Sequence, residues 1–203
     1  MRCADSHHRA SATRRADGRG PMTGDTGSIW VRTMTVCVTA VVAASFAQPA
    51  LAVVINVPAD QPTIQAAVVA AGPGDEIVVA NGPWAESVDL NAMGTPGNLT
   101  IRAANPRGAT VDGGVGPAFF VIGFSGDITI QDFRLNQNSL NATGVVHVID
   151  LNGILLVENC EFLANYGGNG VRVETSGVTQ TNVEIRDSLF DNPNDNLDAI
   201  SVE

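Results

Sequence analysis

The most constraining feature of the sequence is a repeat of about 28 residues. Four similar segments each begin with an aliphatic residue followed by a polar one, and their first residues lie 29, 27 and 28 positions apart. These segments begin at Ile101, Ile130, Val157 and Ile185. A second apolar triplet recurs in phase, beginning at Val146, Val171 and Ile200. Two strands therefore repeat together, and such self-similarity is typical of solenoid folds.

The stretch from Asp75 onward has the residue pattern of short strands and turns. Apolar triplets alternate with clusters of Gly, Asn, Asp and Pro, and no helical period is present. The period is too short for a propeller blade but matches one coil of a parallel β-helix. Residues 75–203 then make about four to five coils. The sequence predicts an all-β, right-handed, single-stranded parallel β-helix, with the hand taken from the general crossover preference and the family resemblance below.

Stacked coils bury side chains of the same phase in common columns. The sequence predicts three inward columns: Ile130, Val157 and Ile185; Phe133, Cys160 and Ser188; and Leu135, Phe162 and Phe190. Asn138, Asn165 and Asn192 are expected to form an amide ladder in the turns.

Residues 53–74 are expected to cap the first coil with a strand and an α-helix. From Ile64, apolar residues recur at i, i+3, i+4 and i+7, which predicts a helix within 60–72. Asp60 or Thr63 is available as the N-cap. One small apolar face suits a helix that closes the end of a solenoid.

Residues 34–52 have the order of a signal peptide. The apolar run 36–46 ends before a small-residue cleavage site, Ala50-Leu51-Ala52, and it is shorter than the roughly 20 residues that a membrane span needs. We expect a secreted protein, extracellular or at the cell surface, with the periplasm as an alternative and no integral membrane span in the mature form. Residues 1–33 are read as a disordered or mis-assigned upstream extension.

Composition limits the partners of residues 53–203. This part contains five Arg, no Lys and 18 Asp and Glu, a net charge of −13. Such a charge repels phosphate backbones, so nucleic-acid binding is excluded. Its single cysteine, Cys160, cannot form an internal disulfide, and its apolar register favours a buried, inert thiol over a nucleophile.

Polar residues of the same phase are expected to line up on the outer surface. Asp132, Asn159 and Asp187 share one position of the repeat; Arg102, Gln131, Glu158 and Arg186 share the preceding one; His147, Arg172 and Ser201 share the outward slot of the second strand. Such rows serve cross-strand pairing and solubility in one interpretation, and ligand binding in the other.

Residues 57–90, VPADQPTIQAAVVAAGPGDEIVVANGPWAESVDL, resemble the opening of the pectin-lyase-like superfamily of right-handed parallel β-helices. The resemblance rests on the TIQAA helix, the GD turn and the strand after it. It implies an extracellular polysaccharide as the partner. The Q-D-T sequence of pectinesterases does not follow Cys160-Glu161-Phe162, which disfavours that activity.

Lyases of this superfamily combine Ca²⁺-binding carboxylates with an Arg or Lys base. Binding of a polyuronate to so acidic a chain would need a bridging cation such as Ca²⁺. The resemblance therefore implies a base, a calcium site and substrate contacts on the outer surface. The residues assigned to them are Arg172 or Arg186 as the base; Asp132, Glu158 and Asp187 for Ca²⁺; and His147, Gln131 and Glu158 for the substrate.

A competing hypothesis is a non-catalytic β-helical surface or adhesive module of a longer cell-surface protein. The sequence stops at Glu203 directly after a strand triplet, so further coils or self-association at an open edge are expected. A polysaccharide lyase, a glycoside hydrolase and a binding module therefore all stay open at this point.

Overall fold

The structure, a computed structural model, describes residues 51–137, 144–163, 169–177, 181–191 and 199–202. They all belong to the compact unit Ala47–Glu203. The predicted extension 1–33, nearly all of the predicted leader 34–52 and the three asparagines of the predicted amide ladder lie outside the described residues.

Three parallel sheets form the sides of a β-solenoid of about four turns. Sheet A contains β1 (Val54–Val57), β2 (Glu76–Val79), β5 (Leu99–Ala103), β8 (Ile128–Gln131), β11 (Gly153–Glu158) and β14 (Thr181–Arg186). Sheet B contains β3 (Gly82–Ala85), β6 (Ala109–Asp112), β9 (Phe133–Asn136), β12 (Glu161–Phe162) and β15 (Leu189–Phe190). Sheet C contains β4 (Val88–Asp89), β7 (Phe119–Ile122), β10 (Val146–Ile149), β13 (Val171–Glu174) and β16 (Ile200–Val202).

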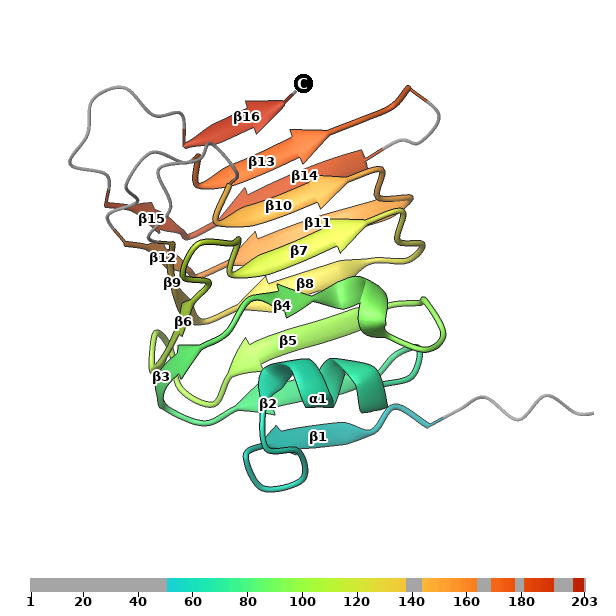
Figure 1. Ribbon diagram of the computed structural model, residues 1–203, viewed down its shortest axis with the longest axis vertical. Coiled ribbons are helices and arrows are strands. Elements are labelled where there is room, and N and C mark those ends of the chain that lie inside the picture. Colours follow the sequence, from blue (N-terminus) through green and yellow to red (C-terminus); the bar gives the residue numbers. More distant parts are fainter. Residues whose placement is uncertain (1–50, 138–143, 164–168, 178–180, 192–198, 203) are drawn as a thin grey trace, which may run out of the picture. The chain divides into compact units, whose positions relative to one another are not determined.

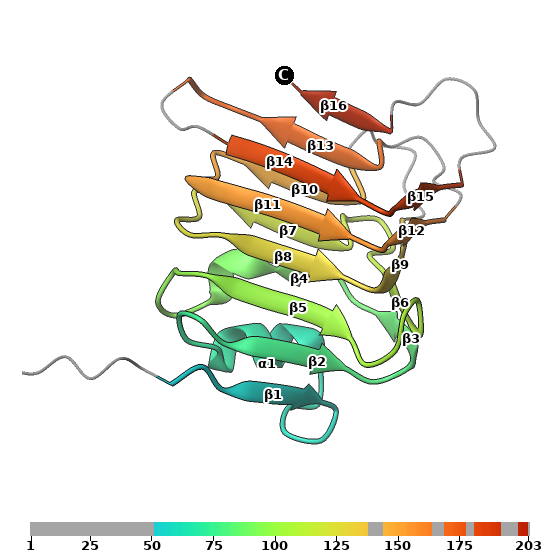
Figure 2. The same cartoon turned by 180° about the vertical axis from the view of Figure 1, so that it is seen from behind.

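From β2 onward the chain visits the sheets in the order A, B, C, and each later strand pairs with the strand of the same sheet one turn earlier. Between β1 and β2, both in sheet A, the chain forms α1 instead. Figure 1 shows sheet C facing the viewer, and Figure 2, turned by 180°, shows sheet A facing the viewer. The parallel β-helix predicted from the repeat is confirmed at this level.

The inward columns follow the predicted register. Ile130 pairs with Val157, which pairs with Ile185. Leu135, Phe162 and Phe190 pair in the same way, and the rings of Phe162 and Phe190 stack with centroids 4.5 Å apart. In the column of Phe133, Cys160 and Ser188, the backbone N–H of Cys160 donates to Ser188 Oγ at 3.2 Å. The repeat therefore predicted the core correctly.

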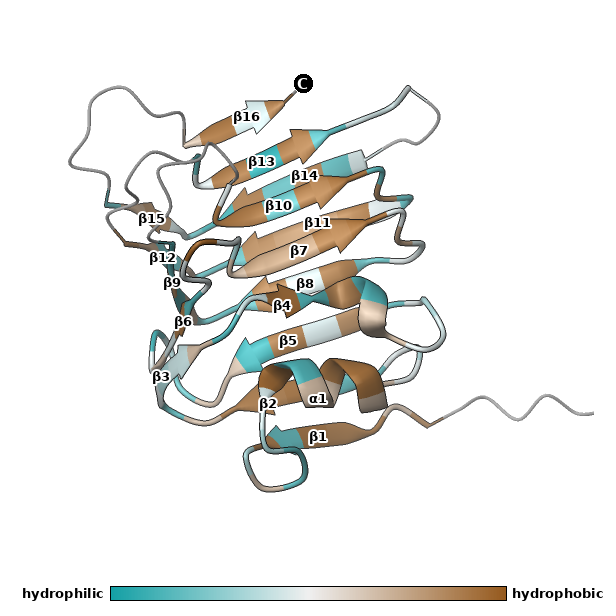
Figure 3. Ribbon diagram, in the orientation of Figure 1, coloured by the Kyte–Doolittle hydropathy of each residue, from teal (hydrophilic) through white to brown (hydrophobic). Residues whose placement is uncertain are grey.

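Side chains alternate between the core and the outer surface along each strand. In β13 the two valines are buried, whereas Arg172 and Glu174 face outward and are only partly buried. Figure 3 shows the resulting alternation of hydrophobic and hydrophilic bands along this strand. Because the strands are in register, outward side chains of successive turns form rows across each sheet.

Helix α1 (Ile64–Ala70) lies at the first turn, where it contacts β1, β2 and β4 (Figure 1). It lies within the predicted 60–72, and Thr63, one of the two predicted N-cap candidates, is the N-cap, its hydroxyl accepting from Ala66 N at 3.0 Å. The other N-cap candidate, Asp60, instead accepts from Asn56 N at 2.7 Å. The helix ends where Ala71 adopts an extended backbone.

Two contacts across the chain fix α1 to the segment that precedes sheet C. Glu86 accepts from the backbone N–H groups of Ile64 and Gln65, both at 3.0 Å. The Gln65 side chain in turn holds the backbone of Asp89, accepting from its N–H at 2.7 Å and donating to its C=O at 3.1 Å. The capping helix therefore positions the strand that carries Asp89 on the outer surface.

Candidate functional site on the outward face of sheet C

The predicted row of Arg102, Gln131, Glu158 and Arg186 lies on the outward face of sheet A. Arg102 pairs with Gln131, Gln131 with Glu158, and Glu158 with Arg186, so these four side chains are neighbours across four strands. Adjacent members are about 4.8 Å apart, the spacing of hydrogen-bonded strands. The row exists as the repeat predicted.

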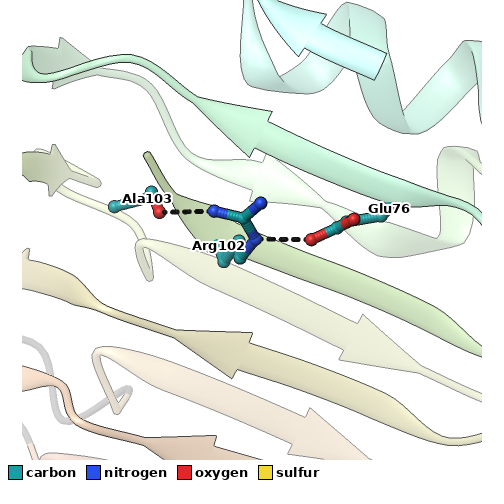
Figure 4. A network of polar contacts seen from close by, with 3 residues as sticks. All are labelled: Glu76, Arg102 and Ala103. Carbon is teal, nitrogen blue, oxygen red and sulfur yellow. Dashed lines mark hydrogen bonds and ion pairs between the residues drawn. The ribbon is translucent and has the colours of Figure 1, made fainter. Parts of the chain in front are cut away.

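The arginines of this row pair with glutamates of the neighbouring row. Arg102 makes an ion pair with Glu76 and donates to the carbonyl of Ala103 at 3.4 Å (Figure 4). Arg186 pairs with Glu184 at 2.6 Å, and hydrogen bonding to Glu184 raises the pKa of Arg186. A general base requires the opposite shift, because it has to release a proton before it can accept one. The contacts of Arg186 thus favour surface pairing over the predicted base role.

Asp132 and Asp187, two of the three residues predicted to bind Ca²⁺, lie with Asn159 at the corner between sheets A and B. Asp132, Asn159 and Asp187 have φ angles of 67°, 50° and 49°, in the left-handed region that Asn and Asp tolerate best among non-glycine residues. Asn159 Nδ2 donates to Asp132 Oδ1 at 2.6 Å. The row therefore has a conformational function, which is to turn the chain from one sheet to the next.

A cation has little support at this corner. Within the described parts of the chain, no group of three or more His, Cys, Asp or Glu side chains is arranged to hold a metal ion. Glu158 lies on the sheet A row one position before Asn159, and one oxygen of Asp132 is already engaged by Asn159. Calcium binding by Asp132, Glu158 and Asp187 stays a prediction from the resemblance.

The predicted row of His147, Arg172 and Ser201 lies on the outward face of sheet C. His147 pairs with Arg172, and Arg172 with Ser201. On the other side His147 pairs with Phe120, which pairs with Asp89. Polar and aromatic side chains from five strands therefore follow one another across the sheet.

Glu174 contacts both basic residues of this row. Its Oε1 lies 2.9 Å from His147 Nε2 and 2.8 Å from Arg172 Nε. Because an ionised carboxylate only accepts, Nε2 of His147 carries the hydrogen of the first contact. The His147 side chain is only 9% exposed and that of Arg172 20%, so both groups are largely shielded from solvent.

An open pocket of about 330 Å³ adjoins His147. It is lined by Ser87, Asp89, Pro117, Phe120 and His147. The rings of Phe120 and His147 lie with centroids 5.4 Å apart and planes inclined by 49°. Ser87 Oγ donates to the carbonyl of Pro117 at 2.6 Å, which ties together the two segments that enter β4 and β7. The pocket thus combines one aromatic face with a carboxylate, an imidazole and a hydroxyl.

The structure separates the predicted site residues into three groups. His147 and Arg172 lie together on sheet C, whereas Gln131, Glu158 and Arg186 lie on sheet A. Asp132 and Asp187 occupy the corner that follows sheet A. A single site that uses both predicted arginines is therefore not formed by adjacent strands.

Sequence reasoning missed several residues around the pocket. Phe120 lies 27 residues before His147, so the period itself was a sufficient signal for it. Glu174 lies two residues after Arg172 and therefore on the same face of the strand. No comparable signal marks Ser87 and Pro117, which precede their strands in turns.

Cys160 is fully buried, as predicted, and its Sγ lies 3.4 Å from the carbonyl of Glu158 and 3.6 Å from that of Ile130. Burial raises the pKa of its thiol to about 12. The thiolate needed for nucleophilic chemistry is therefore absent near neutral pH.

No helix within the described residues is long and apolar enough to cross a membrane. The chain matches no family model, no curated protein and no solved structure. The parallel β-solenoid is shown by its own geometry, and the resemblance to the pectin-lyase-like superfamily stays a prediction.

Proposed function

We propose that the protein is secreted and binds an extracellular polysaccharide along the outward face of sheet C. The observation that carries this proposal is the pocket in which the Phe120 ring lies beside His147 and Asp89. Ligand sites typically combine apolar or aromatic walls with a few fixed polar groups. This pocket has both, and it lies on a row of side chains that repeats with every turn.

The chemistry of a sugar ring fits these groups. One face of a pyranose presents C–H groups that can stack on the Phe120 ring, whereas its hydroxyls both donate and accept hydrogen bonds. Asp89 offers a carboxylate acceptor, Ser87 a hydroxyl and His147 an imidazole. Because strands repeat about every 4.8 Å, a polymer lying across sheet C would meet further side chains at regular intervals.

The contacts favour binding without cleavage. Arg172, a predicted base, has its Nε against Glu174 at 2.8 Å, and the raised pKa of Arg186 opposes proton acceptance. The proposed protein is therefore a glycan-binding module, and the calcium-dependent lyase is the outcome against which it is tested.

The test is calorimetric titration of the purified protein with a panel of plant and bacterial oligosaccharides. Phe120→Ala should weaken binding of any ligand found by about fivefold, since a stacked aromatic contributes on the order of 1 kcal/mol. Leu156→Ala is the matched control, because Leu156 is an outward, half-buried apolar residue of sheet A. It should change the affinity less than about twofold.

Two results would overturn the proposal. Equal loss of binding in both variants would move the site away from the pocket. Formation of unsaturated product on incubation with polyuronate and Ca²⁺, seen by ultraviolet absorbance, would establish a lyase instead.

A further inference from the structure

We propose that Glu174 sets the charge specificity of the sheet C pocket, so that the pocket accepts neutral sugars and rejects uronates. This inference rests on the glycan-binding function proposed above, and it names the class of ligand. Its observations are the shared contacts of Glu174 and the charge of the pocket wall.

The charge of Arg172 is already matched by the carboxylate of Glu174, which His147 also contacts. His147 Nε2 and Arg172 Nε both contact Oε1 of Glu174, at 2.9 and 2.8 Å. A bound uronate would need these same groups, because Arg and protonated His are the side chains that pair with carboxylates in half-buried sites. Glu174 occupies the position that a ligand carboxylate would take.

The remaining charge of the pocket wall is negative. Asp89 lines the pocket, and its Oδ1 accepts from the backbone and side-chain nitrogens of Asn91 at 2.9 and 2.7 Å. Both donors are neutral, and within the described residues Asp89 makes no ion pair. An anionic sugar in the pocket would therefore face Asp89 on one side and Glu174 beyond His147 on the other.

Partial burial makes this repulsion effective. The Glu174 side chain is 34% exposed and that of His147 9%, so solvent screens their charges less than it screens charges on an open surface. The charge of −13 on residues 53–203 adds long-range repulsion of a polyanion. A neutral sugar escapes both effects and still finds donors and acceptors in Asp89, Ser87 and His147.

The experiment compares two ligands of equal length, a neutral galacto-oligosaccharide and the corresponding oligogalacturonate, in calcium-free buffer. The readout is the ratio of the two dissociation constants for each protein. The unmodified protein should prefer the neutral ligand by about tenfold or more. Glu174→Gln, which removes the charge and keeps the shape, should shrink that ratio severalfold by improving uronate binding.

Two further variants keep the test decisive. Glu184→Gln is the matched control, because Glu184 pairs with Arg186 in the same way on sheet A, and it should leave the ratio unchanged. Asp89→Asn removes the other negative charge, and it should also shrink the ratio. It therefore provides a second test in case Glu174→Gln does not fold. Thermal melting curves identify any variant that is unfolded.

The outcomes separate this inference from the function beneath it. Tight uronate binding that depends on Phe120 would overturn the charge specificity and leave glycan binding intact. An unchanged ratio in folded Glu174→Gln would also overturn it. If neither ligand nor any other glycan of the panel binds, both proposals fail together.

Discussion

The outward faces of sheets A and C are built by the same repeat, yet their charged side chains have different surroundings. On sheet A the pair Arg186 and Glu184 is half exposed, at 51% and 49%. On sheet C, His147 and Arg172 are 9% and 20% exposed and share Glu174, and a pocket with an aromatic wall lies beside them. A row of charges is therefore a regular consequence of the fold, whereas burial and an adjoining pocket distinguish a candidate site.

The largest expected effect on stability lies at the corner that follows sheet A, where the row of Asp132, Asn159 and Asp187 turns the chain. Asn159→Val should lower the free energy of unfolding by about 1–3 kcal/mol, because a β-branched residue is strained at the left-handed φ of 50°. Asn159→Gly tolerates this φ and should cost about 1 kcal/mol, from the lost bond to Asp132. Urea denaturation measures both values. Equal stability of the Val variant and the original protein would refute the conformational role.

The next effect concerns how sheet C is positioned. Glu86→Ala removes two acceptors from the first turn of α1 and should cost about 1–2 kcal/mol in unfolding free energy. It should also weaken glycan binding a fewfold, because α1 holds the Asp89 backbone through Gln65. Glu161→Ala is the control, since Glu161 pairs with Arg134 on sheet B and should affect stability alone. Full glycan affinity in Glu86→Ala would show that α1 does not position the site.

A third comparison is between two residues predicted to contact the substrate, His147 on sheet C and Gln131 on sheet A. His147→Ala should weaken glycan binding by about fivefold, or about 1 kcal/mol, since it removes a polar group from the pocket wall. Gln131→Ala, from the sheet A row, should leave the affinity unchanged. Calorimetry decides between the faces. Loss of binding in Gln131→Ala with none in His147→Ala would transfer the site to sheet A.

The smallest expected effect is that of the exposed ion pair on sheet A. Arg186→Ala should leave the free energy of unfolding nearly unchanged, because solvent screens this exposed pair. The difference from the original protein should shrink further at high salt. Denaturation at low and high salt checks this, and a cost of several kcal/mol that is independent of salt would contradict it.

The sequence predicted the core and the surface rows because both follow from one period. Inward aliphatic residues such as Ile130 and Val157 recur with the coil length, and the outward residues beside them are then aligned by the pleat. Burial of Cys160 followed from the same phase.

The grouping of side chains across strands was beyond such reasoning. Glu174 reaches His147 diagonally, two positions along the neighbouring strand, and this depends on side-chain conformation rather than on period. The pocket also needs Ser87 and Pro117, which lie in turns of unequal length. The helix lies within the predicted range, but no sequence signal indicated that its first turn contacts Glu86, more than 20 residues downstream.

The central claim is that the outward face of sheet C, and not that of sheet A, binds a glycan. The most direct test is a nuclear magnetic resonance titration of the isotope-labelled protein with the best neutral oligosaccharide of the panel. The account predicts chemical-shift changes that cluster at Asp89, Phe120 and His147, with none at Gln131, Glu158 and Arg186. Changes that cluster along the sheet A row, or are absent at a saturating concentration of every glycan tested, would contradict it.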